Sequence, residues 1–324
     1  MRGRLELLAL AAAVQLTAGS APGRAAAAPA LGFPVACTIG QGCEVQHYVD
    51  LDPGPGVRDY RGGRRTYDGH HGVDIRIADM AAQRRGVDVL AAAAGKVLRV
   101  RGGIADISVR ATGLAQVAGR ECGNGVVIDH GDGLQTQYCH LALGSLKVAA
   151  GQSVAAGQAI GRIGVSGQTE FPHLHLSVRR NGAVVDPFAP APGAGPLWTP
   201  EALKAMGYKQ GAILNLGFAA GPVSMEAVES GAVAPPGADP AALVVFGRAI
   251  ELEVGDEVEI RLLGPGGAVL AQSRTPLDRD KAQYLVFVGR KRPAAGWPQG
   301  GYRADYTVHR RGRPVLSRSV GLRL

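Results

Sequence analysis

The stretch that constrains the fold most is Pro172-His173-Leu174-His175-Leu176. Its alternation of histidine and leucine predicts a β-strand, because successive side chains of a strand point to opposite faces. His173 and His175 would then share one face, about 6–7 Å apart along the strand. Pro172 fits the first strand position, where its missing N–H costs least. Two imidazoles on one strand face are a weak sign of a metal site when they stand alone.

A second segment, His70-His71-Gly72-Val73-Asp74, adds a further imidazole and a carboxylate. Gly72 and Val73 disfavour a helix here. An extended strand would separate His70 from Asp74 by about 13 Å, so a turn at His71-Gly72 must bring them together. With one histidine of the His-x-His pair, they make three nitrogen and oxygen ligands. Three such ligands and an open position are typical of a catalytic zinc site.

A third segment, Tyr138-Cys139-His140, lies on the second strand of a predicted hairpin. Its strands, 126–128 and 134–141, flank the turn Gly131-Asp132-Gly133. A histidine beside a zinc-activated water can accept a proton and return it to a leaving amine. The sequence contains no His-Glu-x-x-His motif, so the glutamate base of helical zinc peptidases has no counterpart. A histidine base would fill that role.

Taken in chain order, with 70–74 first, 138–140 second and 172–176 last, the three segments resemble the motifs of the lysostaphin-like (LytM-type) zinc metallopeptidases, which cut peptidoglycan cross-links. A glycine-punctuated repeat around Gly151-Gln152 and Gly157-Gln158 stands between the His140 segment and Pro172. The resemblance covers roughly residues 63–188. It implies a small, mainly antiparallel β-sheet with the site in an open groove.

The resemblance also implies roles for individual residues. His70, Asp74 and His175 would bind one Zn²⁺, and His140 and His173 would be the catalytic residues, serving as base and transition-state stabiliser. Asn124 matches a position at the rim of the family's groove. The segment 102–121 is longer than the usual connection and is expected to reshape one wall of that groove.

The composition divides the chain into five segments. Arg2 and Arg4 precede an apolar run and then small residues, which is typical of a secretory signal peptide; a short N-terminal anchor is the alternative. We expect a signal peptide at 1–28, an N-terminal extension at 29–62, the zinc metallopeptidase domain at 63–188, a Pro/Ala/Gly-rich linker at 189–198 and a β-sandwich-like domain at 199–324. Short β-type runs with Gly-rich turns in the last segment predict the sandwich. The expected fold class is therefore mainly β.

Export would place the four cysteines in an oxidising compartment. Three pairings are possible, and we favour Cys37–Cys43 with Cys122–Cys139. In a simple hairpin register residue 139 faces about residue 125, so the second bridge requires a bulge or loop. We expect an exported protein of the periplasm or cell envelope, or a secreted one. Apart from the N-terminus, no long apolar run predicts an integral membrane protein.

These features predict an exported zinc-dependent endopeptidase that hydrolyses cross-links or stems of peptidoglycan through a zinc-activated water. A wall-binding or hydrolase-activating module on the same fold is an alternative, as is a metalloprotease acting on protein substrates. The net charge of +8 suits an anionic wall or membrane surface, and a nucleic-acid partner is not expected outside the cytoplasm. The C-terminal domain could bind the wall, bind an envelope protein or cover the groove. The sequence does not identify the bond that is cut, or whether 29–62 is inhibitory.

Overall fold

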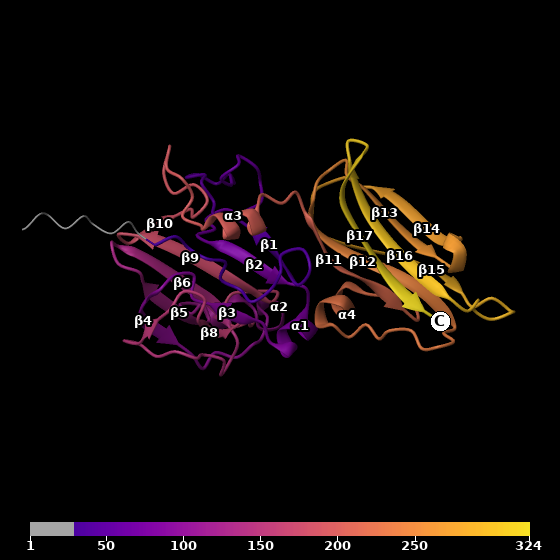
Figure 1. Cartoon of the computed structure of the whole chain (residues 1–324), viewed down its shortest axis with the longest axis horizontal. Coiled ribbons are helices and arrows are strands. Elements are labelled where there is room, and N and C mark those ends of the chain that lie inside the picture. The colour runs from indigo at the N-terminus through magenta and orange to yellow at the C-terminus, as the bar shows by residue number, and fades with distance from the viewer. Residues whose placement is uncertain (1–28) are drawn as a thin grey trace, which may run out of the picture.

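The computed structural model describes residues 29–324, so the predicted signal peptide lies outside the described residues. Two β-rich halves lie side by side along the long axis of the molecule (Figure 1). The strand pairs within the sheets are antiparallel, which confirms the predicted mainly-β fold class. Among the described residues, no helix has the length and apolar character that crossing a membrane would need.

The first half is built on an eight-stranded sheet with the order β1-β2-β9-β6-β5-β4-β7, in which β10 also pairs with β9. A separate pair, β3 and β8, packs beside it (Figure 1). The strands are β1 Cys43–His47, β2 Val73–Ile77, β3 Asp88–Leu90, β4 Gly95–Arg101, β5 Asn124–Asp129, β6 Leu134–Leu141, β7 Ser153–Val154, β8 Ala159–Arg162, β9 His173–Arg180 and β10 Ala183–Val185. The helical turns are α1 Met80–Arg85, α2 Val109–Thr112 and the 3₁₀ turn η1 Leu114–Val117.

Alternation along β9 separates the core from the polar face of the sheet. Leu174, Leu176 and Val178 are fully buried in the hydrophobic core. The two histidines of β9 therefore point to the other face, as the sequence predicts. In the register of the sheet, Asp74 on β2 and Cys139 on β6 both lie opposite His175.

The β5–β6 hairpin contains the irregularity that the second disulfide requires. Asn124 pairs with Leu141 and Val126 with Tyr138, so the register shifts between them. Cys122 and Cys139 form a disulfide at this point, and Cys37 and Cys43 form the other. Both favoured pairings are confirmed. The residue after Cys139, His140, has a positive φ of 63°, a conformation that L-residues rarely adopt.

The second half consists of two antiparallel sheets, with the orders β11-β12-β15 and β14-β13-β16-β17. Their inner faces share a core of aliphatic and tyrosine side chains, as expected for the predicted sandwich. The strands are β11 Ala212–Ala219, β12 Ala242–Leu252, β13 Glu257–Leu263, β14 Val269–Pro276, β15 Lys281–Lys291, β16 Gly301–Arg310 and β17 Arg313–Arg323. The helical elements of this half are α4 Met225–Ser230 and the 3₁₀ turn η2 Pro265–Gly267. The remaining helix, α3 Pro200–Met206, packs in the core of the first half through Ala202 and Met206 (Figure 1).

The two halves are joined by polar contacts that surround α1 and α4. Asn215 Nδ2 donates to Asp79 Oδ2 at 2.9 Å, and Arg248 donates to the carbonyl of Ala78. Close packing continues at Gly231, where an added Cβ would lie 2.5 Å from that of Ala81. The relative position of the halves is therefore set by specific contacts as well as by the linker.

Candidate active site

The three predicted metal ligands converge at the junction of β2 and β9. Asp74 Oδ1 lies 2.9 Å from His175 Nδ1 and 3.2 Å from His70 Nε2. His70 Nε2 and His175 Nδ1 are 3.2 Å apart. Ligand atoms that share one tetrahedral zinc at about 2.0–2.1 Å are roughly 3.3 Å apart. The three side chains can thus bind one ion with little rearrangement.

The outer hydrogen bonds of these histidines explain why a cation would suit the cluster. His70 Nδ1 donates to the Tyr48 carbonyl at 2.7 Å, which leaves Nε2 of a neutral ring as an acceptor. His175 Nε2 lies 3.0 Å from Ser177 Oγ and can donate to it, which leaves Nδ1 as an acceptor. With the carboxylate of Asp74, three electron-pair donors then face one another. A metal ion would satisfy all three, and the outer partners would fix the ring orientations.

His140 and His173 lie beside this cluster, with ring centroids 4.7 Å apart. His140 Nδ1 donates to the Ser166 carbonyl at 2.8 Å, and His173 Nδ1 donates to that of Phe171 at 3.0 Å. The Nε2 atoms are therefore the acceptors of the neutral rings. His173 Nε2 is 3.5 Å from Asp74 Oδ1. Both histidines are buried, and both are within reach of a group bound at the cluster.

Burial and charge set the protonation states of the cluster. Burial lowers the pKa of His140 well below its usual range, and neighbouring His173 and His175 act in the same direction. Burial would raise the pKa of Asp74, but the surrounding histidines hold it well below its usual range. Asp74 is therefore a carboxylate, and His140 is a neutral imidazole that can accept a proton.

The site includes two residues that the sequence analysis did not assign to it. His47, on β1, directs Nδ1 to Asp74 Oδ2 at 3.1 Å. Its Nε2 lies 3.5 Å from Oε1 of Glu251, which belongs to the second half of the chain. Burial lowers the pKa of His47, but its contacts with Asp74 and Glu251 outweigh that effect and raise the pKa to about 9. The contacts join residues 27 and 204 positions apart, and no local pattern in the sequence indicates them.

The histidines face a groove of about 330 Å³. Tyr67 and Phe171 line it together with Val109 and Leu114, which come from the long segment 102–121. This segment therefore does shape one wall, as expected. Leu114 is 61% exposed, so the groove offers apolar surface to a bound molecule.

Asn124 does not lie at the groove rim, contrary to our expectation. It is fully buried, and its amide Nδ2 donates to the carbonyls of Ile104 and Leu141. Its Oδ1 accepts the N–H of Ile104. Asn124 thus anchors the start of segment 102–121 to the hairpin. His71 is exposed although it adjoins His70.

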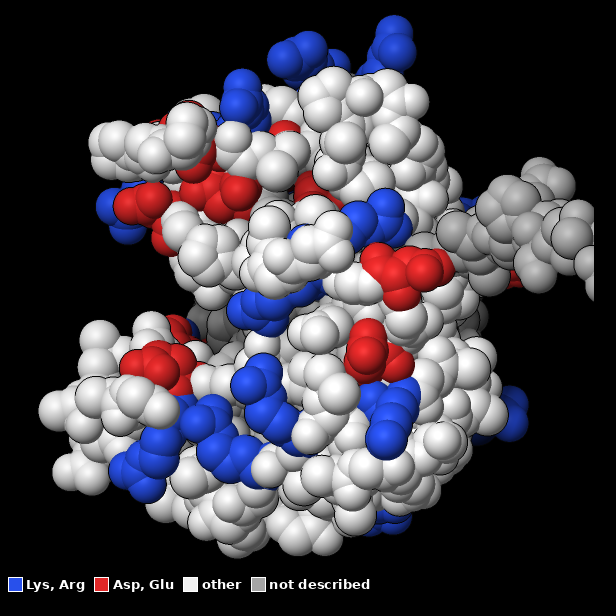
Figure 2. Space-filling model, turned by 90° about the vertical axis from the view of Figure 1, so that its left-hand side faces the viewer, with Lys and Arg blue, Asp and Glu red and all other residues white. Residues whose placement is uncertain are grey.

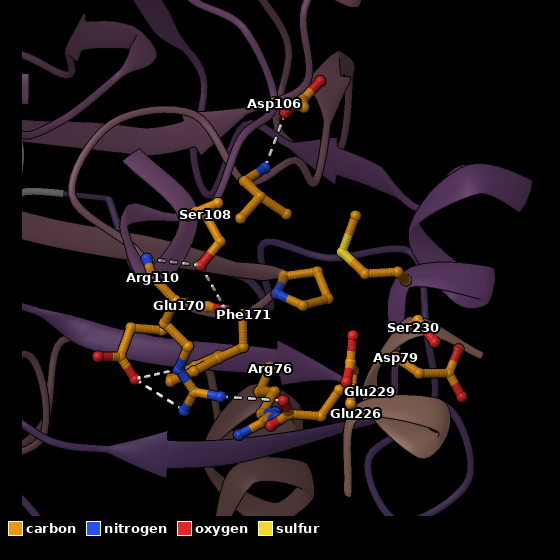
Figure 3. A pocket seen from close by; sticks show the side chains of 14 residues that line it. Arg76, Asp79, Asp106, Ser108, Arg110, Glu170, Phe171, Glu226, Glu229 and Ser230 are labelled. Carbon is orange, nitrogen blue, oxygen red and sulfur yellow. Dashed lines mark hydrogen bonds and ion pairs between the residues drawn. The ribbon is translucent and has the colours of Figure 1, made fainter. Parts of the chain in front are cut away.

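A second cavity of about 250 Å³ lies between the two halves and shares Glu170 and Phe171 with the groove. Figure 3 shows Arg110 between the carboxylates of Glu170 and Glu229 at this cavity. Arg76 is 2% exposed and its guanidinium lies 4.0 Å from the centre of the Phe171 ring. The groove thus borders the contact between the halves.

The arrangement of the site agrees with a comparison against known families, in which residues 68–187 match Peptidase family M23. This part of the chain is an M23 peptidase domain. The family consists of metallopeptidases, which agrees with the resemblance noted in the sequence. The match covers the three segments that supply His70, Asp74, His140, His173 and His175.

Similar proteins share the M23 domain but only part of their length. The DD-carboxypeptidase/endopeptidase Mpg of Neisseria meningitidis is 37% identical over 101 residues, which are 31% of this chain and 22% of the relative. Peptidoglycan DD-endopeptidase ShyA of Vibrio cholerae is 42% identical over 64 residues, 20% of this chain and 14% of the relative. A solved zinc containing peptidase from Vibrio cholerae is 25% identical with a TM-score of 0.33, covering 48% of this chain and 39% of that chain. This chain therefore spans less than a quarter of the length of both curated relatives.

Proposed function

We propose that this chain is an exported, zinc-dependent endopeptidase that hydrolyses peptide cross-links or stems of peptidoglycan. The observation that carries the proposal is the convergence of His70, Asp74 and His175 beside two further histidines in an open groove of an M23 domain. Two curated relatives of this domain are a DD-carboxypeptidase/endopeptidase and a peptidoglycan DD-endopeptidase, which supports the same substrate class.

In this proposal His70, Asp74 and His175 bind the zinc. When bound, zinc supplies a Lewis acid that polarises the scissile carbonyl and lowers the pKa of a water molecule. His140, kept neutral by burial, accepts a proton at Nε2 and then donates it to the leaving amine. His173 lies beside the cluster, with its Nε2 3.5 Å from Asp74 Oδ1, and would stabilise the developing oxyanion.

Other features support an extracytoplasmic substrate. Both disulfides are formed, and disulfides persist in oxidising compartments. Acidic and basic side chains both occur on the face in Figure 2, so the net charge of +8 does not form one uniform basic surface there. Recognition of the substrate is therefore assigned to the groove, and the second half remains available to bind wall or an envelope protein.

The regulatory alternative is less favoured because all five histidine and aspartate positions are present and converge. A binding or activating module would not require a buried neutral His140 beside a complete set of metal ligands. A protein substrate stays an alternative, because peptide hydrolysis uses the same chemistry on wall and on proteins.

The proposal is tested by incubating zinc-loaded protein, residues 29–324, with purified cross-linked peptidoglycan and identifying the products by mass spectrometry. We expect cross-linked fragments to decrease and fragments with free peptide ends to accumulate, with the glycan strands intact. Unfolded casein in a parallel reaction tests the protein substrate. Loss of casein with intact peptidoglycan would replace the proposed substrate, and no cleavage of either would favour the regulatory alternative.

A further inference from the structure

Glu251 extends from the second half of the chain toward the proposed metal ligands of the first half. It lies near the end of β12, between Ile250 and Leu252, which pair with β15 while Glu251 does not. Its Oε1 is 3.5 Å from His47 Nε2, and His47 Nδ1 is 3.1 Å from Asp74 Oδ2. A chain of three side chains therefore connects the second half to a proposed zinc ligand.

The position of Glu251 is unusual for a surface glutamate. Its backbone has a φ of 54°, which is strained for a residue with a Cβ, and its side chain is only 14% exposed. Among the described residues, buried Oε1 has no hydrogen-bond partner at ordinary distance. The nearest side-chain nitrogen to this oxygen is Nε2 of His47, at 3.5 Å, so we take His47 as the group on which this carboxylate acts.

The ring of His47 is held in place from several sides. Tyr67 and His70 pack edge-on against it, with ring centroids 5.3 and 5.8 Å away. In this orientation the Nδ1–H can donate to Asp74 Oδ2 only. The other oxygen, Oδ1, is the one that faces His70 and His175. His47 thus determines which carboxylate oxygen is presented to the metal.

We propose that the second half of the chain orients the metal site, with Glu251 as a positioning residue that orients His47 and, through it, Asp74. The inference rests on the zinc site of the proposed function and extends it to the role of the second domain. Contacts of Asn215 with Asp79 and of Arg248 with Ala78 hold Glu251 against the first half. The second domain would thereby influence zinc affinity, in addition to any role it has in binding substrate.

The test measures the zinc dissociation constant of the full chain by competition with a chromophoric chelator. Glu251→Ala keeps the Cβ and the backbone strain but removes the carboxylate, and we expect zinc to bind about tenfold more weakly. Glu251→Gln keeps an acceptor oxygen for His47 and should remain within about threefold of the parent. Glu253→Ala is the matched control, because Glu253 lies two residues away but pairs with Arg310 at the surface and should leave zinc affinity unchanged.

A double-mutant cycle with His47→Ala distinguishes positioning from a general structural effect. If Glu251 acts through His47, then Glu251→Ala will weaken zinc binding no further when His47 is already alanine. The melting temperature of the metal-free protein should differ little between Glu251→Gln and Glu251→Ala. Equal zinc affinity of parent and Glu251→Ala, or additive effects in the cycle, would overturn the inference while leaving the proposed function intact. A parent protein that binds no zinc would overturn both.

Discussion

At the scale of single residues, Asp74 is the residue that contacts most of the histidines in the site. Its carboxylate is buried and has imidazole nitrogens of His47, His70, His173 and His175 within 3.1, 3.2, 3.5 and 2.9 Å. These histidines hold the pKa of Asp74 well below its usual range although burial opposes them, so the carboxylate is their shared anion. Replacing it leaves several imidazoles without their shared anion.

We therefore expect Asp74→Asn to weaken zinc binding at least about a hundredfold. The substitution turns the carboxylate into a neutral amide, in which one oxygen becomes an NH2 group that cannot bind a metal. Zinc content after dialysis against a weak chelator measures the effect. His71→Ala is the control, since His71 adjoins a ligand but is exposed. Retention of a full zinc equivalent by Asp74→Asn would exclude Asp74 as a ligand.

A second residue, Asp186, predicts how stability changes with pH away from the site. Burial raises the pKa of Asp186 to about 6, and Oδ2 has no partner among the described residues. Because the unfolded carboxyl ionises near 3.8, the native state loses relative stability as pH rises from about 4 to about 6. A shift of two pKa units corresponds to about 3 kcal/mol.

Asp186→Asn removes this titration. The free energy of unfolding of the variant relative to the parent should increase by about 3 kcal/mol between pH 4 and pH 7 and be flat beyond that window. Urea unfolding at several pH values provides the measurement. Parallel pH profiles for the two proteins would show that Asp186 does not titrate with a raised pKa.

The site residues that could be predicted from the sequence are those that belong to short local motifs. The His-x-His alternation, the turn before Asp74 and the Tyr-x-His strand are short motifs, and the structure brings their side chains together. His47 and Glu251 could not be found in the same way, because their contacts depend on how two separate sheets dock.

At the scale of elements, the hairpin of β5 and β6 carries His140 to its position. The register shift, the Cys122–Cys139 bridge and the positive φ of His140 occur together. The alternation of apolar residues was enough to predict these strands. The same alternation did not predict β11 as a defined strand, and it did not predict α4. That helix has only 6 residues, and its apolar face packs in a small separate cluster.

Replacing Cys122 and Cys139 by serine should lower the cleavage rate at least tenfold while zinc content stays near one equivalent, because His140 loses its brace but the metal ligands do not. The loss of the cross-link should also destabilise the fold by about 3 kcal/mol. Replacing Cys37 and Cys43 by serine is the control, expected to affect stability with little effect on the rate. Equal rates for the two double variants would contradict this role of the hairpin bridge.

At the scale of the whole molecule, the two halves share a charged contact centred on Glu229 of α4. Its carboxylate lies 2.9 Å from Arg110, 3.3 Å from Arg248 and 4.0 Å from Arg76. Burial and the nearby Arg248 lower the pKa of Arg76 to about 9, while Glu229 opposes them. The sequence predicted two domains. Their docking depends on ion pairs between segments that are far apart in the chain, and no local sequence pattern indicates such pairs.

Glu229→Gln leaves buried arginines without their common anion and should destabilise the protein by about 3 kcal/mol. Thermal unfolding measures the loss, and faster proteolysis within 189–198 would show that the halves separate. Glu226→Gln, an exposed position on the same helix, should change neither. Unchanged stability of Glu229→Gln would mean that the apolar contacts alone hold the halves together.

In the proposed reaction the chain binds zinc through His70, Asp74 and His175 and cleaves peptidoglycan with His140 as the proton acceptor. The deciding experiment measures fragment release from purified peptidoglycan by the parent and by His140→Ala, with zinc content determined on the same samples. We expect one zinc per chain in both proteins and at least about a hundredfold slower release by His140→Ala. Equal release by the two proteins, or a parent that cleaves without zinc, would contradict this mechanism.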